Sequence, residues 1–178
     1  MYSILLFLHS LGRWLVLISL ITSIAIAARG VRKTATTTGN RKAAGPSTAT
    51  TTGSSPQRHR AFTPAANAWR HWTATIAHLQ LLLGMLLYFQ SPIVKYTLPN
   101  DPYHLVTEHV FFRYIHITLM FVAVIVITIG SAKARRATTD PAKYRIMLAW
   151  FAAALLILFI AIPWPFSPLA GRPFIRKF

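Results

Sequence analysis

Four long apolar runs constrain the fold of this chain more than any other feature of its sequence. They cover roughly residues 4–28, 72–91, 107–131 and 145–163. Each run is close to the ~20 residues that an α-helix needs to cross ~30 Å of hydrocarbon. Each must be helical in lipid, because an isolated strand would leave its backbone polar groups without hydrogen bonds. The sequence therefore predicts an all-α integral membrane protein, with a single four-helix bundle over residues 1–178 in a lipid bilayer.

Charge and cysteine content narrow the function classes. Only 12% of the residues are charged, whereas soluble domains carry roughly 25%. The net charge of +16 collects between the apolar runs, as membrane orientation requires, so we expect no nucleic-acid partner. The chain has no cysteine, which excludes disulfides, iron–sulfur clusters and thiolate metal sites.

The basic residues also predict an orientation. Residues 29–71 and 132–145 together hold thirteen of the nineteen Lys and Arg residues. The positive-inside rule places both segments in the cytoplasm and both termini on the outer side. The centre of the first segment consists mostly of Thr, Ala, Gly, Ser and Pro. This composition cannot form a core and predicts a disordered cytoplasmic loop over about 30–61.

Ionisable residues within the apolar runs are the functional candidates, because such residues are costly in a membrane and usually face the bundle interior. His9 and Arg13 share one face of the first helix, and His78 lies on the second. On the third helix, the spacing of His109, Arg113 and His116 places them on one face beside Glu108. We expect His9, Arg13, His78, Glu108 and His109 to face the interior, and Gly84 to allow two helices to approach closely.

Depth relates two of these histidines. At ~1.5 Å per residue, His9 lies ~28 Å above Ala28 and His116 lies ~25 Å above Lys133. The two rings are therefore expected at nearly the same level in the outer half. Haem b in a membrane bundle is commonly held by two imidazoles at equal depth. His9 and His116 are thus candidate metal ligands, and Arg13 or Arg113 could pair with a propionate.

Two further interpretations of these residues stay open. Histidines are also suited to hydrogen-bond a quinone oxygen. In the other interpretation the role is structural, because a membrane histidine often forms only a helix–helix hydrogen bond worth around 1 kcal/mol. The chain would then be a non-catalytic membrane subunit or a scaffold of a larger complex.

Several stretches resemble a family of small four-helix bacterial membrane proteins that are often labelled cytochrome b or cytochrome-b-like. They are LHSLGRW (8–14), AHLQLLLGMLLYFQSPIV (77–94), EH (108–109), ITIGSAKARRATTD (127–140) and ALLILFIAIPWPF (154–166). The first loop is longer here than is usual in the family. Positions that match the pattern of the family are His9, Arg13, Trp14, His78, Gln80, Glu108 and His109, but not His116.

The resemblance implies a multi-pass protein of the bacterial inner (plasma) membrane that takes part in electron transfer with haem. Combined with the residue analysis, it predicts a site for haem b or quinone in the outer half of the bundle. It assigns no catalytic residue. The candidate cofactor-binding residues are His9, Arg13, His78, Glu108, His109 and His116.

Overall fold

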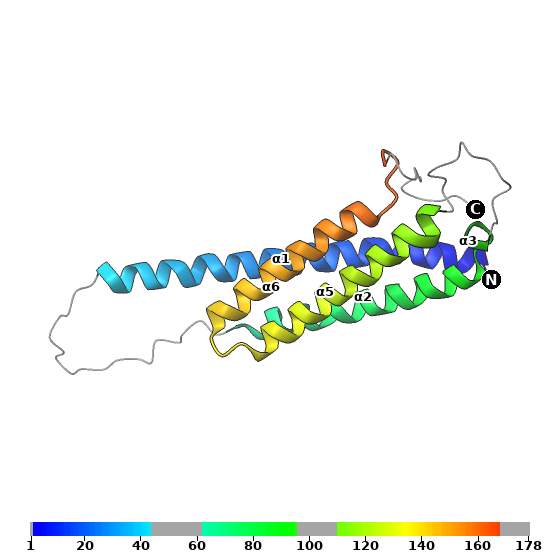
Figure 1. Ribbon diagram of the computed structural model, residues 1–178. Helices are drawn as coiled ribbons and strands as arrows, with labels where there is room; N and C mark the ends of the chain where they lie inside the picture. The colour runs from blue at the N-terminus through cyan, green and yellow to red at the C-terminus, as the bar shows by residue number, and fades with distance from the viewer. Residues whose placement is uncertain (1, 44–61, 96–109, 168–178) are drawn as a thin grey trace.

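The computed structural model describes residues 2–43, 62–95 and 110–167, with side chains described through 34 in the first range. Its elements are α1 (Tyr2–Ala43), α2 (Pro64–Gln90), α3 (Pro92–Lys95), the π-helix η1 (Phe111–His116), α5 (Ile117–Arg136) and α6 (Asp140–Ala161). Four helical segments in the described part are long and apolar enough to cross a membrane. They are α1, α2, the continuous segment of η1 and α5, and α6. The predicted four-helix membrane bundle is therefore confirmed (Figure 1).

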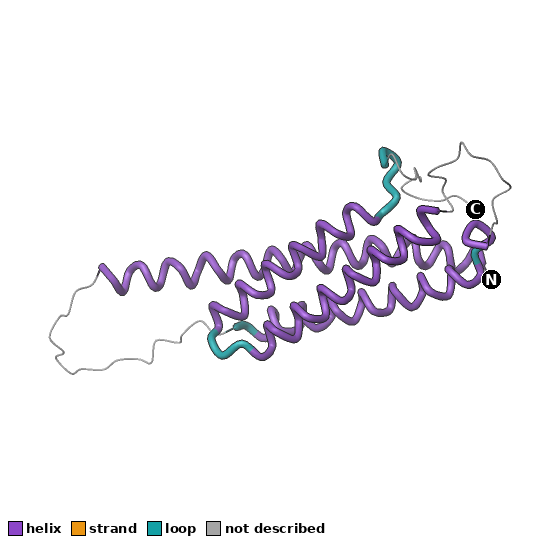
Figure 2. The backbone as a smooth tube through the Cα atoms, in the orientation of Figure 1, coloured by secondary structure: helices purple, strands orange, loops and turns teal. Residues whose placement is uncertain are grey.

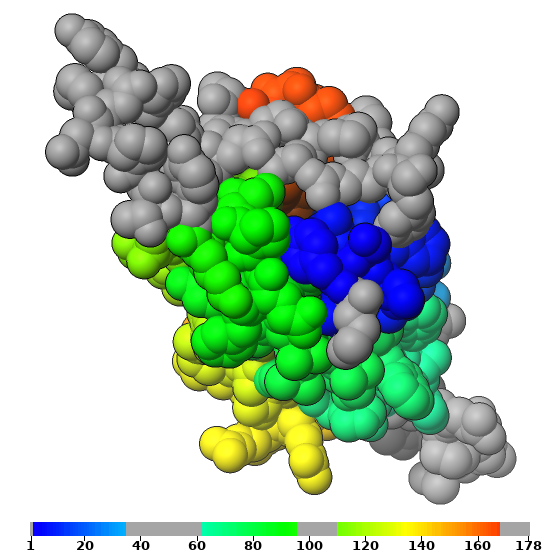
Figure 3. Space-filling view, turned by 90° about the vertical axis from the view of Figure 1, so that its right-hand side faces the viewer, coloured from blue at the N-terminus to red at the C-terminus, as the bar shows by residue number. Residues whose placement is uncertain are grey.

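The helices pack in a closed ring. Helix α1 packs on α2 and α6, and α5 packs on the same two neighbours. Successive long helices alternate in direction, as the tube drawing shows (Figure 2). The start of α1, the end of α2, η1 and the end of α6 therefore lie together; we call this the histidine end, and Figure 3 looks onto it. The start of α2, the end of α5 and the start of α6 form the opposite end, which we call the basic end.

Two predicted boundaries differ from the structure. Helix α2 begins at Pro64 and not near residue 72, because Thr63 caps it by accepting a hydrogen bond from the Ala66 N–H at 3.1 Å. Proline is favoured in the first turn, since that turn needs no intrahelical N–H donor. Helix α1 continues past Ala28 to Ala43. The disordered loop predicted over about 30–61 was thus wrong for 30–43, where Ala, Arg and Lys favour helix and no proline interrupts it; residues 44–61 lie outside the described part.

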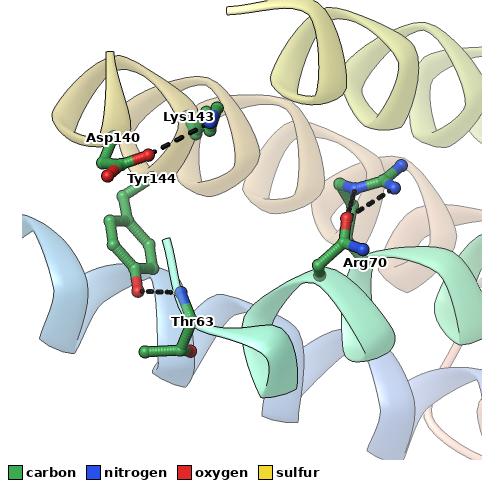
Figure 4. A network of polar contacts seen from close by, with 6 residues as sticks. Thr63, Arg70, Asp140, Lys143 and Tyr144 are labelled. Atoms are coloured by element: carbon green, nitrogen blue, oxygen red, sulfur yellow. Dashed lines mark hydrogen bonds and ion pairs between the residues drawn. The ribbon is translucent and has the colours of Figure 1, made fainter. Parts of the chain in front are cut away.

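Glycines bring the helices close together near the basic end. A Cβ at Gly30 would collide with the Tyr144 ring, and one at Gly130 would collide with the Trp150 Cβ. Small residues serve this purpose in membrane bundles, where close packing replaces the hydrophobic driving force. The Tyr144 hydroxyl also accepts a hydrogen bond from the Thr63 N–H at 3.2 Å and so joins α6 to the start of α2 (Figure 4).

Candidate functional site at the histidine end

His9 of α1 and His116 at the end of η1 lie face to edge inside the bundle. Their ring centroids are 6.4 Å apart and their planes are inclined by 74°. The two histidines that were predicted at nearly the same depth therefore lie beside each other. Both rings line a cavity of ≈ 200 Å³ whose walls are mostly apolar. Its polar lining residues are Tyr2, His9, Ser10, Arg13, Gln80, Tyr88, Ser91 and His116.

The protonation of the His116 ring follows from its hydrogen bond. His116 Nδ1 lies 2.8 Å from the Ala161 carbonyl oxygen. A carbonyl only accepts, so Nδ1 carries the hydrogen. An apolar surrounding favours an uncharged ring, and a neutral imidazole with a hydrogen on Nδ1 has a lone pair on Nε2. His116 therefore offers Nε2 as an acceptor.

Two prolines after α6 explain why that carbonyl is open. Within a helix the Ala161 carbonyl would accept from the residue four positions on, which is Pro165 and has no N–H. Pro163 opens the Phe159 carbonyl in the same way, and the Trp164 Nε1–H fills it at 2.8 Å. Pro163 and Pro165 therefore leave two carbonyls of α6 without a backbone donor. The Phe159 carbonyl accepts from the Trp164 ring, and the Ala161 carbonyl accepts from the His116 ring.

The His9 ring has the opposite tautomer. Gln80 Nε2 lies 2.7 Å from the His9 carbonyl oxygen and 3.1 Å from His9 Nδ1. The carbonyl requires a donor at the shorter distance, which fixes the amide orientation of Gln80. Its second N–H then points to His9 Nδ1, which accepts, so the ring hydrogen of a neutral His9 is on Nε2.

Close approach of α1 and α2 makes this contact possible. A Cβ at Gly12 would collide with Gln80 Oε1, and a Cβ at Gly84 would lie 3.1 Å from His9 Cε1. Each glycine thus provides space for a polar side chain of the facing helix. The prediction that Gly84 allows a close helix approach is confirmed.

The π-helix sets the position of His116. Residues Phe111 to His116 form wide turns, and the His116 ring packs against the rings of Phe111 and Phe112 at centroid distances of 5.9 and 5.7 Å. Wide π turns are rare and often occur at functional sites. The predicted stripe of Arg113 and His116 assumed α-helical spacing. Accordingly Arg113, unlike Arg13, is not among the residues that line the cavity.

His78 does not join this cluster. His78 is exposed on the outer surface of the bundle, so the prediction that it faces the interior was wrong. Its Nδ1 donates to the Ala74 carbonyl at 2.7 Å and its Nε2 lies 3.4 Å from the Thr128 hydroxyl. The inner face of α2 instead carries Thr73, Ala77 and Gln80, at spacings of four and three. Glu108 and His109 lie outside the described residues.

Comparison with known proteins gives no relative. No family model, curated protein or solved structure matches the chain. The similarity to cytochrome-b-like proteins therefore stays a prediction from the quoted stretches. Within the described residues, no three His, Cys, Asp or Glu side chains are grouped as metal ligands. The chemistry of the cavity therefore has to be argued from His9 and His116 and from the groups that orient their rings, Gln80 and the Ala161 carbonyl.

Proposed function

We propose that this protein is a membrane electron-transfer protein that binds a quinone in the cavity lined by His9 and His116. The observation that carries the proposal is the pair of opposite tautomers at one cavity. His9 offers an Nε2–H donor and His116 offers an Nε2 acceptor, because each Nδ1 is engaged by Gln80 or Ala161. The hydrogen bonds of the two rings to described residues are made by their Nδ1 atoms.

The two forms of a quinone match this pair. A quinone carbonyl accepts from the His9 Nε2–H, and the hydroxyl of the reduced form donates to His116 Nε2. When the quinol is oxidised, the proton of one hydroxyl passes to His116, whose Nδ1–H stays bonded to Ala161 and helps to hold the charged ring, and the proton of the second hydroxyl passes to water. The two electrons pass to or from a separate redox protein. The apolar walls suit the ring and the tail of a membrane quinone.

Haem b fits these residues less well. His116 has the arrangement usual for a metal-bound histidine, with the second nitrogen held by a carbonyl. His9 does not, because Gln80 donates to its Nδ1 and leaves the hydrogen on the nitrogen that would bind iron. The pair as arranged therefore does not match a haem held by two imidazoles.

A second candidate function is that of a non-catalytic subunit of a larger complex. It is favoured by His78, which is exposed at the middle of a membrane-spanning helix. Polar residues in that position usually bond to a neighbouring helix. In this case the histidine pair would be a polar cap that stabilises one end of the bundle.

A binding experiment separates the candidates. The full chain in nanodiscs is titrated with a short-tailed quinone while its tryptophan fluorescence is recorded; Trp14 and Trp164, two of its five tryptophans, have ring centroids 6.2 Å apart beside the cavity residues Arg13 and Pro163. His9→Ala and His116→Ala should each weaken binding about tenfold, the size of one hydrogen bond of about 1.4 kcal/mol. His78→Ala is the matched control and should bind as the unchanged chain does.

The opposite result has a clear meaning. If the two cavity substitutions lower the melting temperature but leave quinone affinity equal to that of His78→Ala, the pair is structural. An absorption spectrum after expression with added haem tests the cofactor directly. A Soret band that shifts on reduction and disappears in His116→Ala would replace the quinone proposal by haem.

We also propose that both termini face the outside of a bacterial inner membrane, with 29–71 and 132–145 in the cytoplasm. The support is the thirteen basic residues in those segments. The chain has no cysteine, so single-cysteine variants report directly. Lys95→Cys should react with an impermeant reagent on intact cells, and Ser54→Cys should react only after the cells are opened. The reverse pattern would invert the orientation.

A further inference from the structure

The basic end carries a large excess of positive charge. Asp140, the only acidic residue within the described ranges, already pairs with Lys143 at 3.1 Å. No carboxylate of the described residues is left to balance the other cations of this end. These include Arg29, Arg70, Lys133, Arg135, Arg136 and Arg145.

Arg70 is the buried member of this group. Its side chain is 7% exposed and lies between α2 and α5. Nη1 donates to the Ser131 carbonyl at 3.1 Å and to the Ser131 hydroxyl, while Nε and Nη2 donate to Asn67 Oδ1 at 3.2 and 2.8 Å. All these acceptors are neutral. A guanidinium has five N–H groups, so one Nη2–H has no acceptor among the described residues.

A second arginine adds to the local charge. Arg135 lies on α5 one turn beyond Ser131, to which Arg70 is hydrogen-bonded, and its side chain is exposed. The end of α5, with its open carbonyls, compensates only part of one positive charge. Arg70, held by neutral acceptors with Arg135 on the same helix as its partner Ser131 and no carboxylate among the described residues nearby, therefore calls for an anion from outside the described residues.

Neighbouring tryptophans place this pair at the level of lipid headgroups. Trp69 and Trp72 flank Arg70 on α2 and are 36% and 58% exposed. Exposed tryptophans of membrane helices collect at the boundary between hydrocarbon and water. The anions present at that depth on every side of the bundle are lipid phosphates.

We propose that Arg70 and Arg135 bind the phosphate of an anionic phospholipid in the leaflet at the basic end. Phosphate oxygens suit the planar fork of arginine, and basic pockets between membrane helices are known to hold such headgroups. Asn67 and Ser131 fix the Arg70 guanidinium in advance, so little freedom is lost on binding. This site is independent of the quinone proposal.

Lipid retention and thermal stability together test the site. The full chain is placed in nanodiscs of phosphatidylcholine alone or with added phosphatidylglycerol, and lipid that stays bound after detergent extraction is measured by mass spectrometry. Phosphatidylglycerol should raise the melting temperature of the unchanged chain. Arg70→Gln should remove this increase and reduce retained phosphatidylglycerol about tenfold, as expected for the loss of a charge-assisted hydrogen bond.

Two further variants keep the test decisive. Arg135→Gln changes an exposed side chain and should reduce retention even if Arg70→Gln folds poorly. Lys95→Gln removes one exposed positive charge at the histidine end and should retain lipid as the unchanged chain does. Equal retention in all variants would overturn the proposal. It would also be overturned if Arg70→Gln lowers the melting temperature equally in both lipid mixtures, because Arg70 would then only join α2 to α5.

Discussion

The two ends of the bundle use glycine for different purposes. At the basic end, Gly30 and Gly130 leave space for the aromatic side chains of Tyr144 and Trp150, which fill it completely. At the histidine end, Gly12 and Gly84 leave space for polar side chains, and a cavity remains beside them. Glycine therefore allows tight aromatic packing between helices at the basic end. At the histidine end it allows polar side chains to be held in a fixed orientation beside the cavity.

We expect this difference to separate effects on stability from effects on the proposed quinone binding. Aromatic packing against a glycine contributes contacts that a larger residue would disrupt. A glutamine or histidine side chain that packs against a glycine makes fewer apolar contacts than an aromatic ring would. The close contact fixes the direction of the hydrogen bonds that the polar side chain makes. We therefore expect substitutions at the two ends to affect different measurements, and the following predictions test that division.

The largest effect is expected from Gly130→Ala at the basic end. The new Cβ would overlap the Trp150 Cβ, which is fixed to the backbone of α6 and can move only with the helix. Overpacking of this kind costs about 1–3 kcal/mol of unfolding free energy. The melting temperature in nanodiscs should fall by several degrees while quinone affinity changes little. An unchanged melting temperature would show that α5 and α6 are not tightly joined here.

Gly12→Ala should have the opposite profile. The new Cβ would displace Gln80 Oε1, the end of a side chain that can move, so the stability loss should be smaller than for Gly130→Ala. The displaced amide would no longer hold His9, and quinone affinity should fall about tenfold, the size of a hydrogen bond near 1.4 kcal/mol. Gly84→Ala, whose Cβ would be 3.1 Å from His9 Cε1, should give a weaker effect of the same kind. If Gly12→Ala lowered the melting temperature as much as Gly130→Ala and left quinone affinity unchanged, the two ends would not differ in the way proposed.

Removing a hydrogen bond between α1 and α2 away from the two ends should lower the unfolding free energy less than the glycine substitutions do. Thr73 Oγ1 lies 2.8 Å from Ser23 Oγ and donates to the Ser19 carbonyl at 3.1 Å, which joins α2 to α1. Thr73→Val removes these bonds at nearly constant volume, and such bonds contribute about 0.6 kcal/mol on average in membrane bundles. Thermal unfolding measures the loss. Thr75→Val is the control, because the Thr75 hydroxyl bonds only to the His71 carbonyl of its own helix.

The sequence predicted the helices and the level of the histidines but not their surroundings. Apolar length fixes a membrane span, and the rise per residue sets the depth of His9 and His116. The face of α2 that turns inward was misjudged at His78, because apolar residues surround that helix on all sides and give no reliable inner face. The π-helix before His116 has no signature in the sequence. Thr63-Pro64 did carry a helix-start signal that marks the true beginning of α2.

The smallest effect is expected from Pro165→Ala. Alanine restores an N–H four residues after Ala161, where it can compete with His116 Nδ1 for the carbonyl that now accepts at 2.8 Å. The competition is partial, because Pro163 still ends the helix. His116 should then populate both neutral tautomers, which nitrogen NMR of the ring detects directly, and quinone affinity should fall only two- to threefold, or about 0.5 kcal/mol. Pro163→Ala is the matched control, since its new N–H competes for the Phe159 carbonyl held by Trp164 and leaves His116 unaffected.

If both proline variants shift the His116 tautomer equally, the conformation of the whole segment after α6, and not one missing N–H, sets the tautomer. If Pro165→Ala alone does so, one missing N–H sets the acceptor at the cavity.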